Sequence, residues 1–316
     1  MFEIMMTLFV IVIVGYVAGK LGYMGGTFDK RLSKLVIDIT CPALILSSAM
    51  GGELPDRRYI VPLLGISVLT YAVLAVIAWF LPRFLTRRKR DEGVIGFALM
   101  FGNVGFMGYP VVASIFGHQA VFYAAVLNVV NTFAVFTVGT MLVTGGEGTT
   151  RKKFNKKVVY GTPMLAAYMA MLIVALGIDQ IPAAISQPLT MIGNITVPAA
   201  LLIIGSSMSH LPLRALVGVS GEPSGEASGT VAVYVTTLLR LAVLPLGVHL
   251  LCMALGFDPF VVGINTVVIA MPVATYGTIL CLKYGRDTTL ITEATFITTL
   301  LSVLTIPLVA LLIANV

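Results

Sequence analysis

Long apolar runs separated by short polar stretches occupy almost the whole of this chain. A helix needs about 20 mostly apolar residues to cross a bilayer, because the hydrocarbon core is about 30 Å thick. By that rule the sequence predicts ten membrane-spanning segments. In chain order they cover residues 3–21, 31–50, 59–82, 93–117, 119–143, 157–177, 183–209, 231–255, 259–284 and 288–314. We therefore expect an all-α membrane protein with ten transmembrane helices.

Basic residues gather in every second loop between these segments. The loops after segments 1, 3, 5, 7 and 9 carry 17 of the 20 Lys and Arg residues. Cytoplasmic loops are enriched in Lys and Arg, so we expect these loops inside the cell and both termini outside. The basic stretch 144–156 is then a cytoplasmic loop that divides a first five-helix unit, 1–143, from a second, 157–316.

Two motifs recur in the two halves of the chain. The sequence DITCPAL at Asp38–Leu44 matches NITVPAA at Asn194–Ala200, at an offset of 156 residues. In segments 4 and 9, Gly102–Pro110 and Asn265–Pro272 each place an Asn seven residues before a Pro, at an offset of 162. Five helices in each copy turn the second copy upside down in the membrane. We therefore expect two inverted five-helix repeats, an organisation common among secondary transporters.

The motifs in segments 4 and 9 predict helices that are interrupted inside the membrane. Pro110 and Pro272 each remove a backbone donor and crowd the preceding turn, and Gly105 and Gly108 loosen the first break further. Bare backbone groups at membrane depth are tolerated only against protein or in a water-filled cavity. Paired interruptions of this kind indicate the binding site of a secondary transporter.

Polar side chains beside these interruptions are candidate substrate ligands. The N-terminal end of a half-helix attracts anions, and Asn103 and Asn265 add amide groups next to it. Each Asn either holds a substrate carboxylate or caps the unpaired backbone of its own helix. Further candidates, which line the cavity or bond between helices, are Asn128 and Asn131 on one face of segment 5, and Thr275 and Tyr276 after the second break.

Asp38, Arg240 and Glu293 are ionisable candidates inside predicted spans, where a charge costs about 2.5–3.5 kcal/mol on insertion scales. Asp38 carries a coupling proton, faces the substrate path or pairs with a neighbouring helix; its repeat partner Asn194 is neutral. Arg240, five residues before Pro245, bonds freed backbone, pairs with an acid or contacts substrate. Glu293 couples ions or caps its helix near the inner end.

Composition supports a membrane protein and excludes several other classes. The chain is 58% hydrophobic and 11% charged, whereas soluble domains are about 45–50% apolar and 25% charged. The net charge of +6 comes from short loop clusters, so we expect a lipid bilayer around the chain and no nucleic-acid partner. No phosphate-binding loop, HExxH motif or nucleophile elbow occurs, so we expect neither an enzyme nor direct ATP drive. We expect no cofactor or metal beyond a coupling proton or sodium ion.

At these motifs the sequence resembles the auxin efflux carrier family, which holds plant PIN-type carriers and their bacterial and archaeal relatives. The resemblance covers essentially the whole chain and rests on NVGFMGYP in segment 4, MPVATYGTILCLKYGRD in segment 9, PAL in segment 2 and RLAVLP in segment 8. It implies the fold of sodium/bile-acid and sodium/proton antiporters. A scaffold of segments 1, 2, 6 and 7 then supports a transport domain of segments 3–5 and 8–10, which moves as an elevator.

The resemblance also implies residue roles and partners. The family's carboxylate-binding Asn falls on Asn103, its crossover prolines on Pro110 and Pro272, and a polar cavity residue on Asn128. Members commonly form homodimers through the scaffold, and bacterial relatives are associated with malate, malonate or auxin-like acids. The short central loop and the acidic Asp38 depart from the plant pattern.

Taken together, the residues and the resemblance predict a secondary active transporter of small organic anions in the cell membrane. One rival is a cation or proton exchanger of the same fold that uses Asp38 and moves no organic substrate. The other is a membrane receptor, which binds its ligand without moving it.

Overall fold

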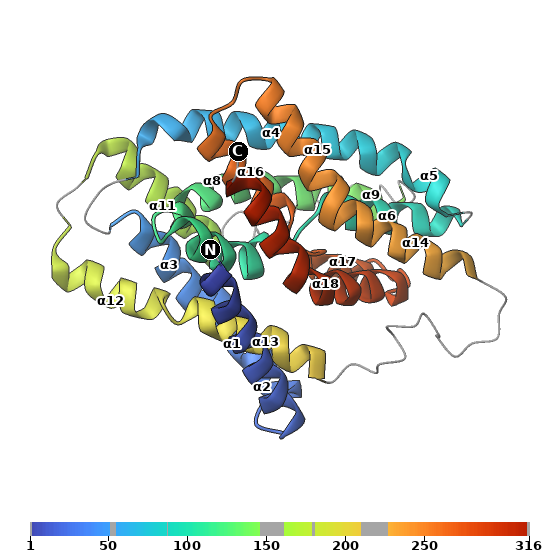
Figure 1. Ribbon diagram of the computed structural model, residues 1–316, viewed down its shortest axis with the longest axis horizontal. Helices are drawn as coiled ribbons and strands as arrows, with labels where there is room; N and C mark the ends of the chain where they lie inside the picture. The colour runs from blue at the N-terminus through green and yellow to red at the C-terminus, as the bar shows by residue number, and fades with distance from the viewer. Residues whose placement is uncertain are drawn as a thin grey trace.

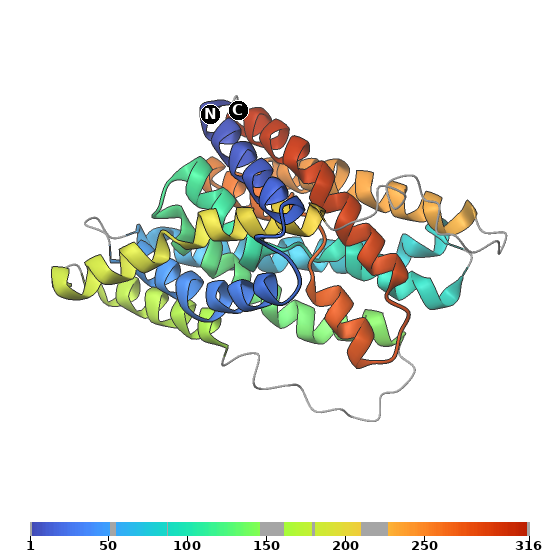
Figure 2. The ribbon, with the colours of Figure 1, turned by 90° about the horizontal axis from the view of Figure 1, so that it is seen from below.

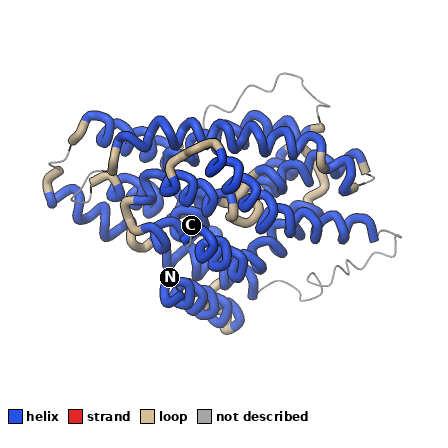
Figure 3. Tube along the Cα trace, turned by 45° about the horizontal axis from the view of Figure 1, so that its top comes forward, coloured by secondary structure: helices blue, strands red, loops and turns tan. Residues whose placement is uncertain are grey.

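The computed structural model describes residues 2–50, 55–86, 88–145, 161–178, 181–209 and 227–314. Every regular element in these ranges is a helix, joined by short loops (Figures 1 and 3). The expected all-α fold is therefore confirmed. The predicted cytoplasmic loop, 144–156, lies outside the described ranges except for its first two residues.

The helices up to residue 145 match predicted segments 1–5. The π-helical stretches η1 and η4 join α-helices end to end, and η3 runs directly into α7. In order the elements are α1 (Phe2–Lys20), α2 (Gly26–Leu35), η1 (Val36–Thr40), α3 (Cys41–Ser48), η2 (Arg57–Tyr59), α4 (Ile60–Phe80), α5 (Pro82–Leu85), α6 (Lys89–Met100), η3 (Val104–Gly108), α7 (Tyr109–Phe116), α8 (Ala120–Ala134), η4 (Val135–Gly139) and α9 (Thr140–Thr144).

The helices after residue 160 match predicted segments 6–10 in the same way. They are α11 (Thr162–Leu176), α12 (Ala183–Gly193), α13 (Thr196–Ser209), α14 (Ala227–Leu238), η6 (Leu239–Val243), α15 (Leu244–Ala254), α16 (Pro259–Ile269), α17 (Tyr276–Lys283) and α18 (Thr289–Ala314). Among the described residues, five helices are long and apolar enough to cross a membrane: 57–85, 120–144, 183–209, 231–254 and 289–313.

Three prolines inside the apolar segments follow directly on a π-helical stretch. Pro42, Pro110 and Pro245 lie at the start of α3, α7 and α15, just after η1, η3 and η6. Proline has no N–H and its ring clashes with the carbonyl of the preceding turn. The wider π turn relieves both conflicts, because its bonds span one residue more. The helix therefore runs on through Pro110, and the first interruption lies before it, at Phe101–Asn103.

The helices pack in two groups. The α1–α13 group contains α1, α2, α3, α11, α12 and α13; in it α1 and α2 pack on α13, and α3 packs on α11 and α12. The α4–α18 group contains α4–α9 and α14–α18; in it α4 packs on α6 and α8, α15 on α16, and α14 on α18. The groups meet where α8 contacts α3 and α11, and where α13 contacts α7 and α18. Figures 1 and 2 both show α1 crossing α13.

Glycines allow α1 and α13 to approach until their backbones touch. A Cβ atom on Gly205 would overlap the carbonyl oxygen of Val12, and one on Gly15 would overlap the carbonyl oxygen of Leu202. Gly19, four residues after Gly15, faces α13 in the same way. Small residues spaced four apart are the usual means by which membrane helices cross closely.

Replacing Gly205 with alanine is expected to destabilise the protein by about 1–3 kcal/mol, because the added methyl group forces α1 and α13 apart. The matched control is Gly65→Ala in α4, where a Cβ meets nothing within 4 Å. Alanine there is expected to be neutral or slightly stabilising, since glycine is a poor helix residue. Thermal melting of both purified variants in detergent tests the pair, and equal melting temperatures would contradict the expectation.

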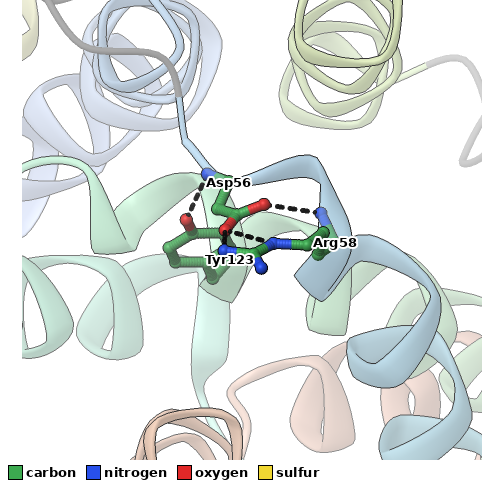
Figure 4. A network of polar contacts seen from close by, with 3 residues as sticks. All are labelled: Asp56, Arg58 and Tyr123. Carbon is green, nitrogen blue, oxygen red and sulfur yellow. Dashed lines mark hydrogen bonds and ion pairs between the residues drawn. The ribbon is translucent and has the colours of Figure 1, made fainter.

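A polar network fixes the start of α4 against α8 (Figure 4). The Asp56 carboxylate accepts hydrogen bonds from the Arg58 backbone N–H (2.9 Å) and from the Arg58 side chain (2.6 and 2.8 Å). The backbone N–H of Asp56 donates to the hydroxyl of Tyr123 on α8 at 2.7 Å. The hydrogen bonds from Arg58 lower the pKa of Asp56. This contact ties two helices of the α4–α18 group together at one end.

Candidate functional site

The two interrupted helices meet at their breaks. Gly102 pairs with Val273 in an isolated antiparallel bridge. The Asn103 N–H donates to the Pro272 carbonyl at 2.8 Å, and the Ala274 N–H donates to the Phe101 carbonyl at 3.0 Å. Backbone groups freed by one break are therefore bonded by the other, as burial at membrane depth requires.

Arg240 holds the C-terminal ends of both broken helices. Its side chain is 0% exposed. Its guanidinium donates to the carbonyls of Leu99 (3.0 Å) and Met100 (3.3 Å) at the end of α6, and to the carbonyl of Met271 (3.1 Å) just after α16. Each helix C-terminus carries a charge of about −0.5, so two ends together balance one guanidinium. Within the described residues Arg240 has no carboxylate partner.

Sequence reasoning left three roles open for Arg240: to bond backbone freed by Pro245, to pair with an acid or to contact substrate. The backbone that it bonds belongs instead to α6 and to the loop after α16. Gly102 makes room for this arrangement, because a Cβ atom there would overlap Nη2 of Arg240. Arg240 is not among the residues that line the cavity, and all its described bonds are to carbonyls; its contact with a ligand stays a prediction.

A cavity of about 860 Å³ lies beside the crossing. Its walls come from α2, η1 and α13 on one side, and from η3, α17 and α18 on the other, so it separates the two helix groups. Of the residues expected at the site, the structure places Asp38, Asn103 and Thr275 on its walls. The volume suits a small ligand, since ligand pockets span about 300–1,000 Å³.

Asn103 is positioned at the N-terminus of η3 and its side chain lines the cavity. Its carbonyl accepts from the N–H groups of Met107 (3.0 Å) and Gly108 (3.1 Å), which starts the π turn. Its side-chain amide makes no hydrogen bond to the described part of the chain. The first N–H groups of a helix have no partner inside the helix, so a free amide and a positive helix end face the same space.

A stripe of hydroxyl groups forms the opposite wall, and sequence reasoning missed it. Thr292, Thr295 and Thr299 of α18 line the cavity together with Thr278 of α17. Their spacing of three and four residues places them on one face of the helix. This polar stripe in an otherwise apolar segment was the signal that would have predicted a cavity wall.

Asn128 and Asn131 lie outside the cavity, in a network inside the α4–α18 group. The Asn128 amide donates to the Tyr109 hydroxyl at 2.8 Å, and the Asn131 amide donates to Asn128 Oδ1 at 2.9 Å. Both Asn side chains are buried, and Asn131 Oδ1 has no partner among the described atoms. The two residues therefore share a face, as the sequence indicated, with Tyr109 as an unforeseen member.

Asn265 lies away from the second break. It is buried within α16, where its amide donates to the Thr70 hydroxyl at 3.0 Å. The break itself spans 270–275, and Pro272 lies inside it. The shared Asn–Pro spacing of segments 4 and 9 therefore does not align the two breaks.

The remaining candidates are not among the residues that line the cavity. Tyr276 begins α17 and packs edge-to-face on Phe136 at 5.7 Å. Glu293 is half-buried on α18, next to the hydroxyl stripe. Asn194 is exposed at the end of α12, away from the cavity. Pro110 is buried at the start of α7, and Gly105 and Gly108 belong to η3.

The described residues contain no group of three or more His, Cys, Asp and Glu side chains that could hold a metal ion. Cys41, Cys252 and Cys281 are buried free thiols. The chemistry on offer is therefore binding by amide, hydroxyl, carboxylate and ammonium groups and by a helix end.

Comparison with known proteins gives consistent results. A family model described as "Membrane transport protein" matches residues 1–310. The chain is 26% identical to an uncharacterized transporter of Methanothermobacter thermautotrophicus, over 97% of this chain and 96% of that protein. It is 25% identical to an uncharacterized transporter of Methanocaldococcus jannaschii, over 99% of each chain. It is 22% identical to a Rhizobium meliloti protein named "Putative malonate transporter", over 94% of this chain and 91% of that protein.

Proposed function

Since this chain belongs to the membrane transport protein family, which is the auxin efflux carrier family, it is a multi-pass membrane transporter, and we propose that it carries small organic anions. The observation that carries this proposal is the unbonded amide of Asn103 at the N-terminus of η3, on the wall of the 860 Å³ cavity. The substrate carboxylate accepts from this amide and from the N–H groups of Gly105 and Phe106, since the Val104 N–H already donates to the Gly102 carbonyl. Such a helix end is an anion site because its donors and its dipole act together.

The charges at the crossing support this assignment. Arg240 balances the negative ends of α6 and α16 behind the crossing. The positive end of η3 is then the helix end that faces the cavity. A substrate anion thus meets a positive helix end at the crossing, and the cationic side chains of Lys30 and Lys34 lie farther along the cavity wall.

We infer that the chain consists of two inverted repeats, 1–143 and 157–316. The Thr196 hydroxyl donates to the Thr40 hydroxyl at 2.9 Å, and these two residues are equivalent at the offset of 156. Residues that are equivalent and in contact lie on a local two-fold axis. Helix packing supports the same relation, because α1 on α13 corresponds to α11 on α3, and α4 on α8 corresponds to α14 on α18.

The crossing supports a second point on that axis. Gly102 and Val273 are 171 residues apart. The same offset of 171 relates Phe101 to Pro272 and Asn103 to Ala274. It therefore converts the hydrogen bond from Asn103 to Pro272 into the one from Ala274 to Phe101. The offset therefore grows from 156 to 171 between segments 2 and 4 of the repeat. The sequence match at 162 placed Asn265 opposite Asn103, whereas this relation places Ala274 there.

Alternating access follows from the arrangement of the two helix groups. We propose that the α1–α13 group is the scaffold, and that the α4–α18 group moves against it as an elevator with the substrate at the crossing. The cavity lies between the groups, and polar contacts across their boundary are few: the Cys41 thiol lies 3.9 Å from the Gly105 carbonyl, and Ser47 Oγ lies 3.0 Å from His118 Nε2. We also propose a cell-membrane location, both termini outside, and a homodimer through the scaffold.

Cross-linking the two groups is expected to stop transport. A Cβ atom on Gly105 meets nothing within 4 Å, so Gly105→Cys is expected to leave uptake intact and to place a second thiol near Cys41. Mercuric ion, which bridges two thiols, should then block uptake, and excess dithiothreitol should restore it. The control carries Gly105→Cys with Cys41→Ser and should be insensitive. Full uptake by a cross-linked protein would contradict relative motion of the groups.

The test of the function itself is radiolabelled counterflow in proteoliposomes. Purified protein is loaded with each unlabelled acid of a mono- and dicarboxylate series that includes malonate, because of the name of the Rhizobium relative. We expect saturable uptake of at least one labelled acid, stimulated by the same acid inside. Saturable binding without counterflow would favour a receptor.

An exchanger that uses Asp38 is the second candidate, because this carboxylate lies on the wall of the same cavity. It predicts sodium- or pH-driven ion flux in proteoliposomes that hold no organic acid. Such flux, with no counterflow of any acid, would replace the proposed function.

A further inference from the structure

Charged side chains follow one face of α2 and η1 along the cavity wall. Lys30, Lys34 and Asp38 all line the cavity. Their spacing of four residues places them one above another on the helix, with about 12 Å between the first and the last. Asp38 lies on η1, three residues before the Cys41 thiol that contacts Gly105 of η3. Of the three charged residues in this row, Asp38 is therefore the one that lies next to the crossing.

Two acids line the cavity, and they differ in how they are bonded. Asp29 accepts from the Gly25 N–H at 2.9 Å and from the Ser206 hydroxyl at 2.7 Å, so it fastens α2 to α13. Asp38 is exposed to the cavity and forms no hydrogen bond or ion pair with any residue that the structure describes. An unpaired carboxylate at membrane depth is costly, so such groups pair or serve ligands.

The cavity therefore offers two unlike binding groups. Asn103 and the start of η3 donate hydrogen bonds to an anion, whereas Asp38 accepts them and carries a negative charge. Asn103 and Asp38 line the same cavity, so a dicarboxylate bound at Asn103 is disfavoured when its second charge reaches Asp38, because like charges repel at short range. A ligand with one carboxylate and one ammonium group satisfies both.

We propose that the substrate of this cavity is a small zwitterionic amino carboxylate, with its carboxylate at Asn103 and its ammonium group at Asp38. This inference rests on the proposed function, because it keeps the substrate carboxylate at Asn103 of the same site. It replaces the net anion proposed above by a carboxylate that also carries an ammonium group. Asp38 is then a specificity-determining residue that rejects dianions. The lysines at 30 and 34 lie farther along the stripe and draw the carboxylate toward the cavity.

The test compares compounds of equal length that differ only in the second group. Proteoliposomes are assayed by counterflow with labelled propionate, β-alanine and malonate, and with labelled butyrate, γ-aminobutyrate and succinate. We expect one amino carboxylate to enter at least about tenfold faster than the dicarboxylate of the same length. A tenfold ratio corresponds to a free-energy difference of about 1.4 kcal/mol. Equal or faster entry of the dicarboxylates overturns the inference.

Variants then assign the preference to Asp38. Asp38→Asn is expected to lower amino carboxylate uptake and raise dicarboxylate uptake, so that the ratio falls at least about tenfold. Asp38→Glu keeps the charge on a longer side chain and is expected to move the preference to an amino carboxylate one methylene shorter. Asp29→Asn is the matched control, since it removes an equal charge from a carboxylate that is already bonded. It is expected to keep the ratio.

The outcomes separate this inference from the function on which it rests. If the ratio of amino carboxylate uptake to dicarboxylate uptake is the same in the unmodified protein and in Asp38→Asn, the inference alone is overturned. Asp38 is then assigned to proton transfer or packing. A ratio that falls equally in Asp29→Asn also overturns it, because the effect is then one of general charge. Absence of counterflow for all six compounds and for longer acids overturns the proposed function and this inference with it.

Discussion

Replacing Asn103 with alanine is expected to weaken substrate binding about 10- to 100-fold while the protein stays folded. The side chain has no hydrogen bond to the described chain and lines the cavity, so its removal leaves no protein group unpaired. A hydrogen bond to a charged partner contributes about 1.5–3 kcal/mol, and each 1.4 kcal/mol is a factor of ten in affinity. Binding isotherms of the best acid, from tryptophan fluorescence or calorimetry in detergent, measure the loss.

The matched control is Asn265→Ala. This amide is buried in α16 and bonds Thr70 at 3.0 Å, so its removal leaves a buried hydroxyl without its partner and costs about 1–3 kcal/mol of stability. We expect a lower melting temperature with little change in affinity, the reverse of Asn103→Ala. If Asn103→Ala binds with normal affinity, the carboxylate does not lie at η3 and the proposed site is wrong.

Replacing Arg240 with methionine is expected to give the largest loss of stability in the chain. The change removes hydrogen bonds to the carbonyls of Leu99, Met100 and Met271, all buried. Each unsatisfied buried carbonyl costs about 1–3 kcal/mol, so the sum approaches the total stability of many proteins, about 5–15 kcal/mol. We expect little monodisperse protein by size-exclusion chromatography and a strongly lowered melting temperature.

Two further variants separate charge from bonding. Arg240→Lys keeps the positive charge but presents a compact ammonium in place of the planar fork that reaches both helix ends, so an intermediate melting temperature is expected. Arg57→Met removes an arginine exposed in η2 and is expected to be neutral. Normal melting of Arg240→Met would show that the two helix C-termini are stabilised without this side chain.

The helical segments could be predicted from the sequence because bilayer thickness sets their length. All ten predicted segments correspond to described helices, and boundaries such as 183–209 coincide with the structure. Asp38, Asn103 and Thr275 were also placed at the cavity, because polar groups in apolar helices are costly and indicate function.

Other features depend on information that local sequence does not carry. Proline was taken to interrupt a helix, but at Pro110 a π turn absorbs it, and the break lies at Phe101–Asn103. The partners of Arg240 lie 31, 140 and 141 residues away in the chain. Asn128 and Asn131 were grouped correctly with each other, but their Tyr109 partner comes from another helix. Such contacts depend on how helices cross, which spacing within one helix cannot show.

The bridge between Gly102 and Val273 has a consequence for how such proteins diversify. The crossing is joined by main-chain hydrogen bonds, and every residue except proline, which has no N–H, offers the same main-chain donor and acceptor. Mutations that exchange side chains around the crossing can therefore accumulate over generations without dismantling the frame that holds the ligand. One scaffold can drift from one cargo to another by small heritable steps, with glycine at 102 and arginine at 240 as the positions least free to change.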